Sequence, residues 1–193
     1  MTPATARADQ ADRRREDLLA AGLRLFATQG FRATTIADIA AATGTAHGLV
    51  YHYFRSKDEL LGAILDRYSF LPALRELLAV SPDRPAAEVL REVAVGFSGM
   101  LDQRSDLLHL VVAESATNPA VAGALARITD EAHGLLAAYL RARVAAGELR
   151  PHDPSVAARA LFWAIITKHL GAARVDDFET GLVEVLLDGI VAR

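Results

Sequence analysis

Residues 34–60, TTIADIAAATGTAHGLVYHYFRSKDEL, decide the fold of this chain. Within them, Ile36, Ile39 and Ala40 recur at the i, i+3, i+4 spacing of a helix that buries one face. Gly44 then interrupts the pattern, as a glycine does where a helix ends in a left-handed residue. The stretch therefore predicts a short helix, a turn at Gly44, and a second helix after the turn.

Two capping boxes fit the starts of helices in this region. Thr35 stands three residues before Asp38, and Ser56 stands three residues before Glu59. In a capping box, each of the two side chains accepts a hydrogen bond from the backbone amide of the other residue. We therefore expect one helix to open at Thr35 and another at Ser56.

The helix after the turn, over residues 45–54, is too short to be stable alone. Val50 and Phe54 face inward at i and i+4, and the remaining positions are small or polar on average. Helix-turn-helix proteins place such a second helix in the major groove of DNA, with its N-terminal residues at the base edges. The pattern therefore favours DNA recognition.

Helical patterns dominate the rest of the chain, and strand signals are nearly absent. A flexible arm is predicted over residues 1–11, and Pro72 is expected to end or kink the helix that begins at Ser56. Asn118 and Asp153 each precede a proline, which is the pairing of an N-cap with proline at the first helical position. Further helices are predicted over residues 12–29, 86–103, 105–116, 119–147, 154–172 and 177–191.

The predicted fold class is all-α. We expect an N-terminal three-helix helix-turn-helix DNA-binding domain and a C-terminal helical domain for ligand binding and dimerisation. The expected divisions are an arm over 1–11, a DNA-binding domain over 12–55, a connecting helix over 56–70 and the C-terminal domain over 71–193.

The composition allows a sizeable core, because 52% of the 193 residues are hydrophobic and 23% are charged. Cysteine is absent, which excludes disulfides, Cys-based zinc sites and thiol nucleophiles. Without a signal peptide or an apolar run of membrane length, a cytoplasmic location and no membrane partner are expected. Residues 1–60 hold eight Arg or Lys against seven Asp or Glu, so DNA affinity has to come from local placement of charge.

Residues 34–60 resemble the signature of the TetR family of transcriptional regulators. In that signature a Thr-Thr pair leads to Ile-Ala, a glycine turn, a Gly-x-x-Tyr-x-x-Phe recognition helix and Ser-Lys-x-Glu-Leu. The positions that match in register are Thr34, Thr35, Ile39, Ala40, Gly44, Gly48, Tyr51, Phe54, Ser56, Lys57, Glu59 and Leu60. Thr45 and Ala46 depart from the commoner Val and Ser, and loss of the serine cap costs about 1 kcal/mol. Either Thr45 caps the recognition helix instead, or this helix is ordered mainly on DNA.

The resemblance implies which residues contact DNA. Contacts to base edges or the groove are implied for Thr45, Ala46, His47, Gly48 and Leu49. Contacts to phosphates are implied for Thr35, Tyr51, His52, Tyr53 and Lys57. Other interpretations stay open: the two tyrosines as core aromatics, His52 as a solvated residue, and Arg13 to Arg15 as either a phosphate-touching arm or a solvated run.

The last two predicted helices are apolar on nearly every face, so each needs covering on two sides. A second copy of the same pair is the plainest second cover, which predicts an isologous four-helix homodimer interface. The candidate interface residues are Leu161, Phe162, Ile165, Phe178, Leu182, Val185 and Leu186.

A ligand pocket is predicted among the helices between residues 86 and 147 and the helix after them. Apolar side chains with a few polar groups between them are typical of small-molecule sites, although each residue here could equally be ordinary core. The candidates are Phe97, Met100, His109, His133 and Trp163. None of the histidines is spaced for a metal site, so no metal and no cofactor are expected.

The resulting hypothesis is a ligand-responsive transcriptional repressor that binds a palindromic DNA operator as a dimer. A small apolar or aromatic effector would release it by moving the helix that starts at Ser56 and so changing the spacing of the recognition helices. The sequence leaves activation, and a ligand that acts as corepressor, open. One rival is a helical enzyme with His109 or His133 as general base, but no nucleophile or metal motif stands beside either, so no enzyme is expected. The other is a dimeric helical interaction module that keeps the fold without binding DNA.

Overall fold

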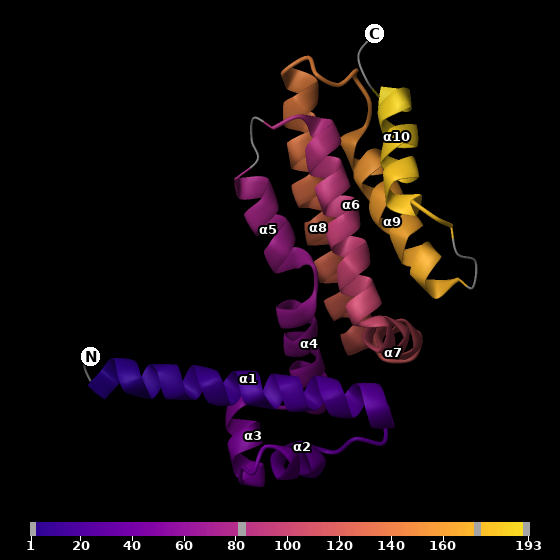
Figure 1. The fold of residues 1–193 in the computed structure, drawn as a ribbon. Coiled ribbons are helices and arrows are strands. Elements are labelled where there is room, and N and C mark those ends of the chain that lie inside the picture. The colour runs from indigo at the N-terminus through magenta and orange to yellow at the C-terminus, as the bar shows by residue number, and fades with distance from the viewer. Residues whose placement is uncertain (1–2, 81–83, 172–174, 191–193) are drawn as a thin grey trace. The chain divides into compact units, whose positions relative to one another are not determined.

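The computed structural model describes residues 3–80, 84–171 and 175–190, and every regular element within these ranges is an α-helix (Figure 1). The all-α prediction is confirmed. In chain order the helices are α1 (Pro3–Gln29), α2 (Ile36–Ala42), α3 (His47–Tyr53), α4 (Lys57–Tyr68), α5 (Leu71–Ala79), α6 (Ala86–Gln103), α7 (Ser105–Ser115), α8 (Pro119–Ala145), α9 (Pro154–Leu170) and α10 (Phe178–Ile190).

The chain divides into two compact units. The first contains residues 1–68 and 106–125, and the second contains residues 69–105 and 126–193. The first unit thus holds α1 to α4 together with nearly all of α7 and the first turns of α8. Residues 106–125 were expected in the C-terminal domain, but here they belong to the same unit as the helix-turn-helix.

The core of the first unit forms where α1 packs against α2 and α4, and α2 against α3. Its largest fully buried side chains are Leu18, Leu19, Phe26, Ile39, Phe54, Leu60, Leu61 and Ile64. Burial of one such side chain contributes about 1.5–3 kcal/mol. The helices α1 and α4 come close at Gly22, where an added Cβ would lie 3.0 Å from Cδ1 of Ile64.

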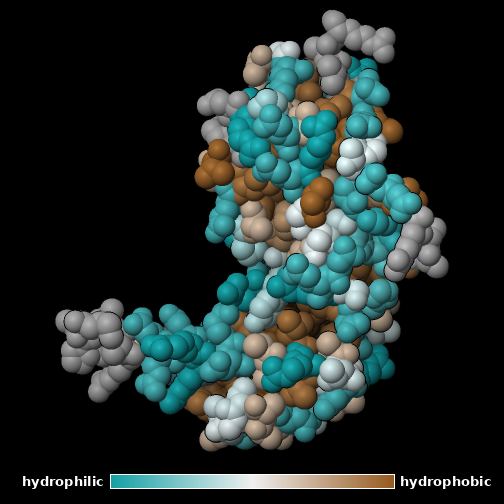
Figure 2. Space-filling view, viewed as in Figure 1, coloured by the Kyte–Doolittle hydropathy of each residue, from teal (hydrophilic) through white to brown (hydrophobic). Residues whose placement is uncertain are grey.

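The N-terminal helix is longer than expected, because α1 begins at Pro3 rather than near residue 12. Proline is suited to the first turn of a helix, and the alanine- and arginine-rich residues that follow have high helix propensity. An arm without regular structure over residues 1–11 is therefore replaced by helix from Pro3 onward. From residue 8 to residue 14 the surface of α1 is mostly hydrophilic, with Asp9, Asp12 and Arg13 exposed (Figure 2).

The helix α5 was not predicted from the sequence. Pro72 lies in its first turn, so this proline opens a new helix after α4 has ended at Tyr68. Two other starts are confirmed: the Asn118 side chain accepts from the amide of Ala120 (3.0 Å), and that of Asp153 from the amide of Ser155 (2.9 Å).

In the second unit, α6 packs against α5, α9 and α10. Two hydrogen bonds tie the start of α6 to the end of α8: Tyr139 Oη donates to the Arg84 carbonyl (2.9 Å), and the Ala86 amide donates to Glu148 Oε1 (2.6 Å). Among the described residues, no helix is long and apolar enough to cross a membrane.

Candidate nucleic-acid interface

The start of α2 is fixed by the predicted capping box. Thr35 Oγ1 accepts from the Asp38 amide (3.2 Å), and Asp38 Oδ2 accepts from the Thr35 amide (2.8 Å). The amide and the hydroxyl of Thr35 both donate to this carboxylate and hold the pKa of Asp38 below its usual value. Thr35 is exposed, so its position at the helix start is fixed while its surface stays open.

The turn between α2 and α3 also follows the sequence in part. Gly44 has φ +63°, in the left-handed region that favours glycine. Thr45 does not cap α3, because its hydroxyl is hydrogen-bonded to that of Thr43 (2.9 Å), and the N-cap Ala46 makes no side-chain cap bond. The helix α3 is instead held by the burial of Val50 and Phe54.

The outer side of α3 carries a row of aromatic and imidazole rings. His47 and Tyr51, one turn apart, pack edge to face with ring centroids 5.1 Å apart, and Tyr51 is 47% exposed. The next rings, those of the exposed His52 and the half-buried Tyr53, are 5.4 Å apart. Gly48, one residue after His47, is also exposed. The exposure of Tyr51 is at odds with a role as a core aromatic.

The ammonium group of Lys57 is hydrogen-bonded to backbone carbonyls of the protein, so it is not free to contact a phosphate. Its Nζ donates to the carbonyls of Phe31 (2.7 Å) and Thr34 (2.9 Å) and reaches that of Arg32 (3.4 Å). The ammonium also lies 4.5 Å from the centre of the Phe31 ring, within cation–π range. The side chain therefore holds the loop of residues 31–34 that leads into α2.

The turn between α7 and α8 holds the same loop from another side. Arg32 Nη2 donates to Thr117 Oγ1 (2.9 Å), and Asn118 Nδ2 donates to Oδ1 of Asp58 (2.7 Å), in the first turn of α4. All these residues belong to the first unit. Sequence reasoning missed these contacts, since nothing in the local pattern links residues 32 and 117.

Ser56 makes only half of its predicted capping box. Its hydroxyl accepts from the Glu59 amide (3.0 Å), but the Glu59 carboxylate accepts from the amide of Arg55 (2.7 Å) instead of that of Ser56.

In the arginine run of residues 13–15, Arg15 lies over the Phe54 ring, 5.4 Å from its centre. Arg13 donates to the Asp9 carbonyl within α1 (3.2 Å).

Two family descriptions match the chain. "Bacterial regulatory proteins, tetR family" matches residues 18–64, and "AefR-like transcriptional repressor, C-terminal domain" matches residues 88–180. The HTH-type transcriptional repressor KstR2 of Rhodococcus jostii is 31% identical over 195 residues, which cover 93% of this chain and 92% of that protein. The chain belongs to the TetR family. As a member of this family, it is a transcriptional repressor with a DNA-binding helix-turn-helix.

Solved structures of other TetR-like chains share this fold. A complex of SmeT with triclosan superposes with a TM-score of 0.77 at 26% identity, over 92% of this chain and 91% of that chain. SmeT is the repressor of the Stenotrophomonas maltophilia multidrug efflux pump SmeDEF. GusR of Salmonella enterica has a TM-score of 0.74 at 26% identity, over 90% of this chain and 93% of that chain.

Four of the five predicted ligand residues of this TetR-family chain lie in the second unit, and three of them, Phe97, Met100 and His133, are buried or half-buried there. His133 is buried on α8 with its ring centre 5.7 Å from that of Phe162, and the ring of Phe162 lies 5.0 Å from that of Phe97. Met100 is half-buried on α6, one turn beyond Phe97. The other two candidates differ: Trp163 is 49% exposed on α9, and His109 is exposed on α7 in the first unit.

The predicted interface residues also separate into two groups. Leu161, Phe162 and Ile165 are buried inside the second unit, so they form its core and cannot face a partner copy as expected. The sequence could not distinguish the faces of α9, because nearly all of them are apolar. On α10 Val185 is 72% exposed, while Phe178, Leu182 and Leu186 are half-buried.

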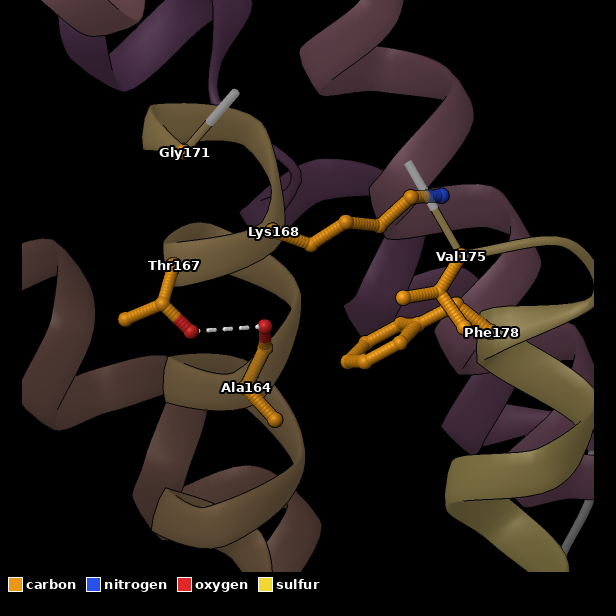
Figure 3. Close-up of a pocket in the computed structure, with 6 residues that line it drawn as sticks. All are labelled: Ala164, Thr167, Lys168, Gly171, Val175 and Phe178. Carbon is orange, nitrogen blue, oxygen red and sulfur yellow. Dashed lines mark hydrogen bonds between the residues drawn. The ribbon is translucent and has the colours of Figure 1, made fainter. Parts of the chain in front are cut away.

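A pocket of about 410 Å³ opens between the end of α9 and the segment that leads into α10 (Figure 3). Its lining residues are Ala164, Thr167, Lys168, Gly171, Val175 and Phe178. Lys168 Nζ pairs with Glu179 Oε1 (2.6 Å), a carboxylate that Ser98 also contacts. The charge of the lysine is thus neutralised beside largely apolar walls. Of the lining residues, sequence reasoning singled out only Phe178, because the pocket depends on where α9 ends.

No group of His, Asp and Glu in the described part of the chain is arranged to hold a metal ion.

Proposed function

We propose that this chain is a ligand-responsive repressor that binds a palindromic DNA operator as a homodimer and is released by a small apolar or aromatic effector. The single observation that carries the proposal is the outer side of α3, where exposed His47, Gly48 and Tyr51 follow a glycine turn. Small and polar side chains there allow the helix backbone to approach the base edges closely.

Within this proposal, base-edge and groove contacts come from Thr45, Ala46, His47, Gly48 and Leu49. Phosphate contacts come from Thr35, Tyr51, His52 and Tyr53, whose hydroxyl and imidazole groups suit phosphate oxygens. Lys57 is assigned a positioning role, since its ammonium is already bonded to the loop of residues 31–34. It sets the approach of α2 and α3 instead of contacting a phosphate.

The proposed dimer uses the outer faces of α9 and α10. Val156, Trp163 and Leu170 are exposed at intervals of seven residues along one side of α9, and Val185 is exposed on α10. Exposed apolar side chains in such a row favour a protein partner. A twofold dimer presents two recognition helices, so the half-sites of its operator lie about 34–36 Å or a multiple of that apart.

The effector is assigned to the second unit, where the aromatic cluster around Phe162 supplies apolar contacts. The triclosan complex of SmeT shows that a related chain takes a chlorinated aromatic molecule. The chain passes between the units three times: after α4, at the start of α7 and within α8. Asn118, directly before α8, donates a hydrogen bond to Asp58 of α4. An effector that prefers one arrangement of these helices would bias DNA affinity by its differential binding.

The test is selection of bound duplexes from a random pool by the purified full chain. The winning duplex is then titrated across a salt series with wild type and with a Thr45→Ala/His47→Ala/Tyr51→Ala variant. We expect a palindromic winner and a loss of affinity of about a hundredfold in the variant, because each lost base contact costs about 1–3 kcal/mol. Circular dichroism of the variant serves as the control for folding. The rival, an interaction module that has kept the fold, predicts that no sequence is enriched.

A further inference from the structure

His133 has an unusual environment for a polar side chain. It is 6% exposed on α8, and its Nδ1 atom is buried without a hydrogen-bond partner among the described residues. Most buried polar atoms in proteins are paired, and an unpaired one costs about 1–3 kcal/mol in general. Arg143 and His152 also have an unpaired buried nitrogen, but other nitrogens of these side chains bond to Glu148 and to a backbone carbonyl.

The surroundings of His133 are aromatic. Its ring centre lies 5.7 Å from that of Phe162. The ring of Phe162 packs edge to face on that of Phe97, with centres 5.0 Å apart, and the ring centres of Phe97 and Phe70 are 5.5 Å apart. These side chains come from α8, α9, α6 and the start of α5, all within the second unit. A buried water needs two to four polar partners, and these phenyl rings offer none. A ligand with both an apolar part and a polar group therefore suits these surroundings better than a water molecule does.

The charges around His133 indicate which kind of ligand group could pair with its ring. Burial lowers the pKa of His133, the Arg159 guanidinium lowers it further, and the Asp130 carboxylate opposes this. Arg159 and Asp130 are themselves paired (3.5 Å), so the charge of this arginine is neutralised and does not favour an acidic ligand. A neutral imidazole has one nitrogen that donates and one that accepts. It therefore suits a neutral group that can do either, such as a hydroxyl.

We propose that His133 Nδ1 is the polar anchor of the effector site, and that the effector is a neutral aromatic or alicyclic molecule with a hydroxyl group. Its apolar body packs against the aromatic cluster of Phe162, Phe97 and Phe70, and its hydroxyl pairs with Nδ1. The inference rests on the proposed function in that it takes the occupant of this site to be the effector.

The experiment compares two probes of similar size, 2-naphthol and 2-methylnaphthalene, by equilibrium dialysis against the full chain without DNA. We expect wild type to bind 2-naphthol about tenfold more tightly, and His133→Phe to lose this preference. The matched control is His109→Phe, an exposed histidine of the first unit, which keeps the preference. Equal binding of the two probes by wild type, or an undiminished preference in His133→Phe, overturns the proposal.

A second measurement needs no variant. In ¹⁵N-histidine-labelled wild type, 2-naphthol shifts the Nδ1 resonance of His133 and 2-methylnaphthalene does not; an Nδ1 resonance that ignores 2-naphthol refutes the anchor. The outcome is separable from that of the proposed function. A chain that selects an operator but shows no hydroxyl preference loses only this inference. A chain that prefers 2-naphthol but enriches no duplex loses only the proposed regulation of DNA binding.

Discussion

Replacing Lys57 by methionine tests whether this side chain stabilises the helix-turn-helix or contacts a DNA phosphate. Methionine keeps most of the stem length but removes the two short hydrogen bonds to the carbonyls of Phe31 and Thr34 and the cation–π contact. A hydrogen bond to a charged group contributes about 1.5–3 kcal/mol. Lys57 is half-buried, water can replace part of the bonding, and release of its rotamers regains about 1–2 kcal/mol.

We therefore expect the Lys57→Met free energy of unfolding to fall by about 2 kcal/mol, which lowers Tm by about 4–8 °C for a chain of this size. Thermal and urea unfolding followed by circular dichroism measure both quantities. The matched control is Arg55→Met, which removes an exposed cation two residues away and should leave Tm unchanged. A positioning role also predicts that Lys57→Met weakens operator binding without reducing its salt slope, whereas loss of a phosphate contact lowers the slope by about 1. Lys57→Met and Arg55→Met variants of equal stability would refute the reasoning.

Three other outcomes follow from the structure. Thr35→Ala breaks the capping box of α2 and should cost about 1 kcal/mol in urea unfolding; unchanged stability would mean that the box contributes nothing. Because the pKa of His133 is lowered in the fold, the unfolded chain binds more protons, so stability is full above the ordinary value of 6.5 and falls as pH drops below it. His133→Phe should flatten this part of the profile in thermal melts from pH 8 to pH 5, and an identical profile would contradict the shift. Trp163→Arg should convert the dimer to monomer in sedimentation velocity, while the control Val80→Arg, at another exposed apolar position, stays dimeric.

The local features of the fold could be predicted from the sequence because each is encoded by neighbouring residues. The capping box of Thr35 and Asp38, the left-handed Gly44 and the N-caps Asn118 and Asp153 all depend on spacings of a few residues. The same is true of the all-α class, since helical periodicity repeats along the whole chain.

Features that depend on distant contacts could not be predicted in the same way. On α9 the neighbours Phe162 and Trp163 are both large and apolar, and packing against α6 and α8 decides that the first is buried and the second exposed. Pro72 is compatible with either the end or the start of a helix, and the structure has it at a start. By sequence the hydroxyl of Thr45 could cap α3, but in the structure it is hydrogen-bonded to the hydroxyl of Thr43.

The candidate DNA site shows the same division. The outward side of α3 follows from the inward positions of Val50 and Phe54, which the periodicity identifies. The role of Lys57 does not, because its partners lie in a loop 23 to 26 residues earlier in the chain. A motif therefore locates such a residue but leaves the direction of its side chain to tertiary structure.

The most direct test of the central claim is the stoichiometry and symmetry of operator binding. The selected duplex is compared by analytical ultracentrifugation and fluorescence anisotropy with a duplex in which one half-site is scrambled. The account predicts two copies of the chain on the intact palindrome and a loss of affinity of more than about tenfold when one half-site is scrambled. A single copy on the duplex, or equal affinity for the intact and half-scrambled sites, would contradict a dimer that reads DNA with two α3 helices.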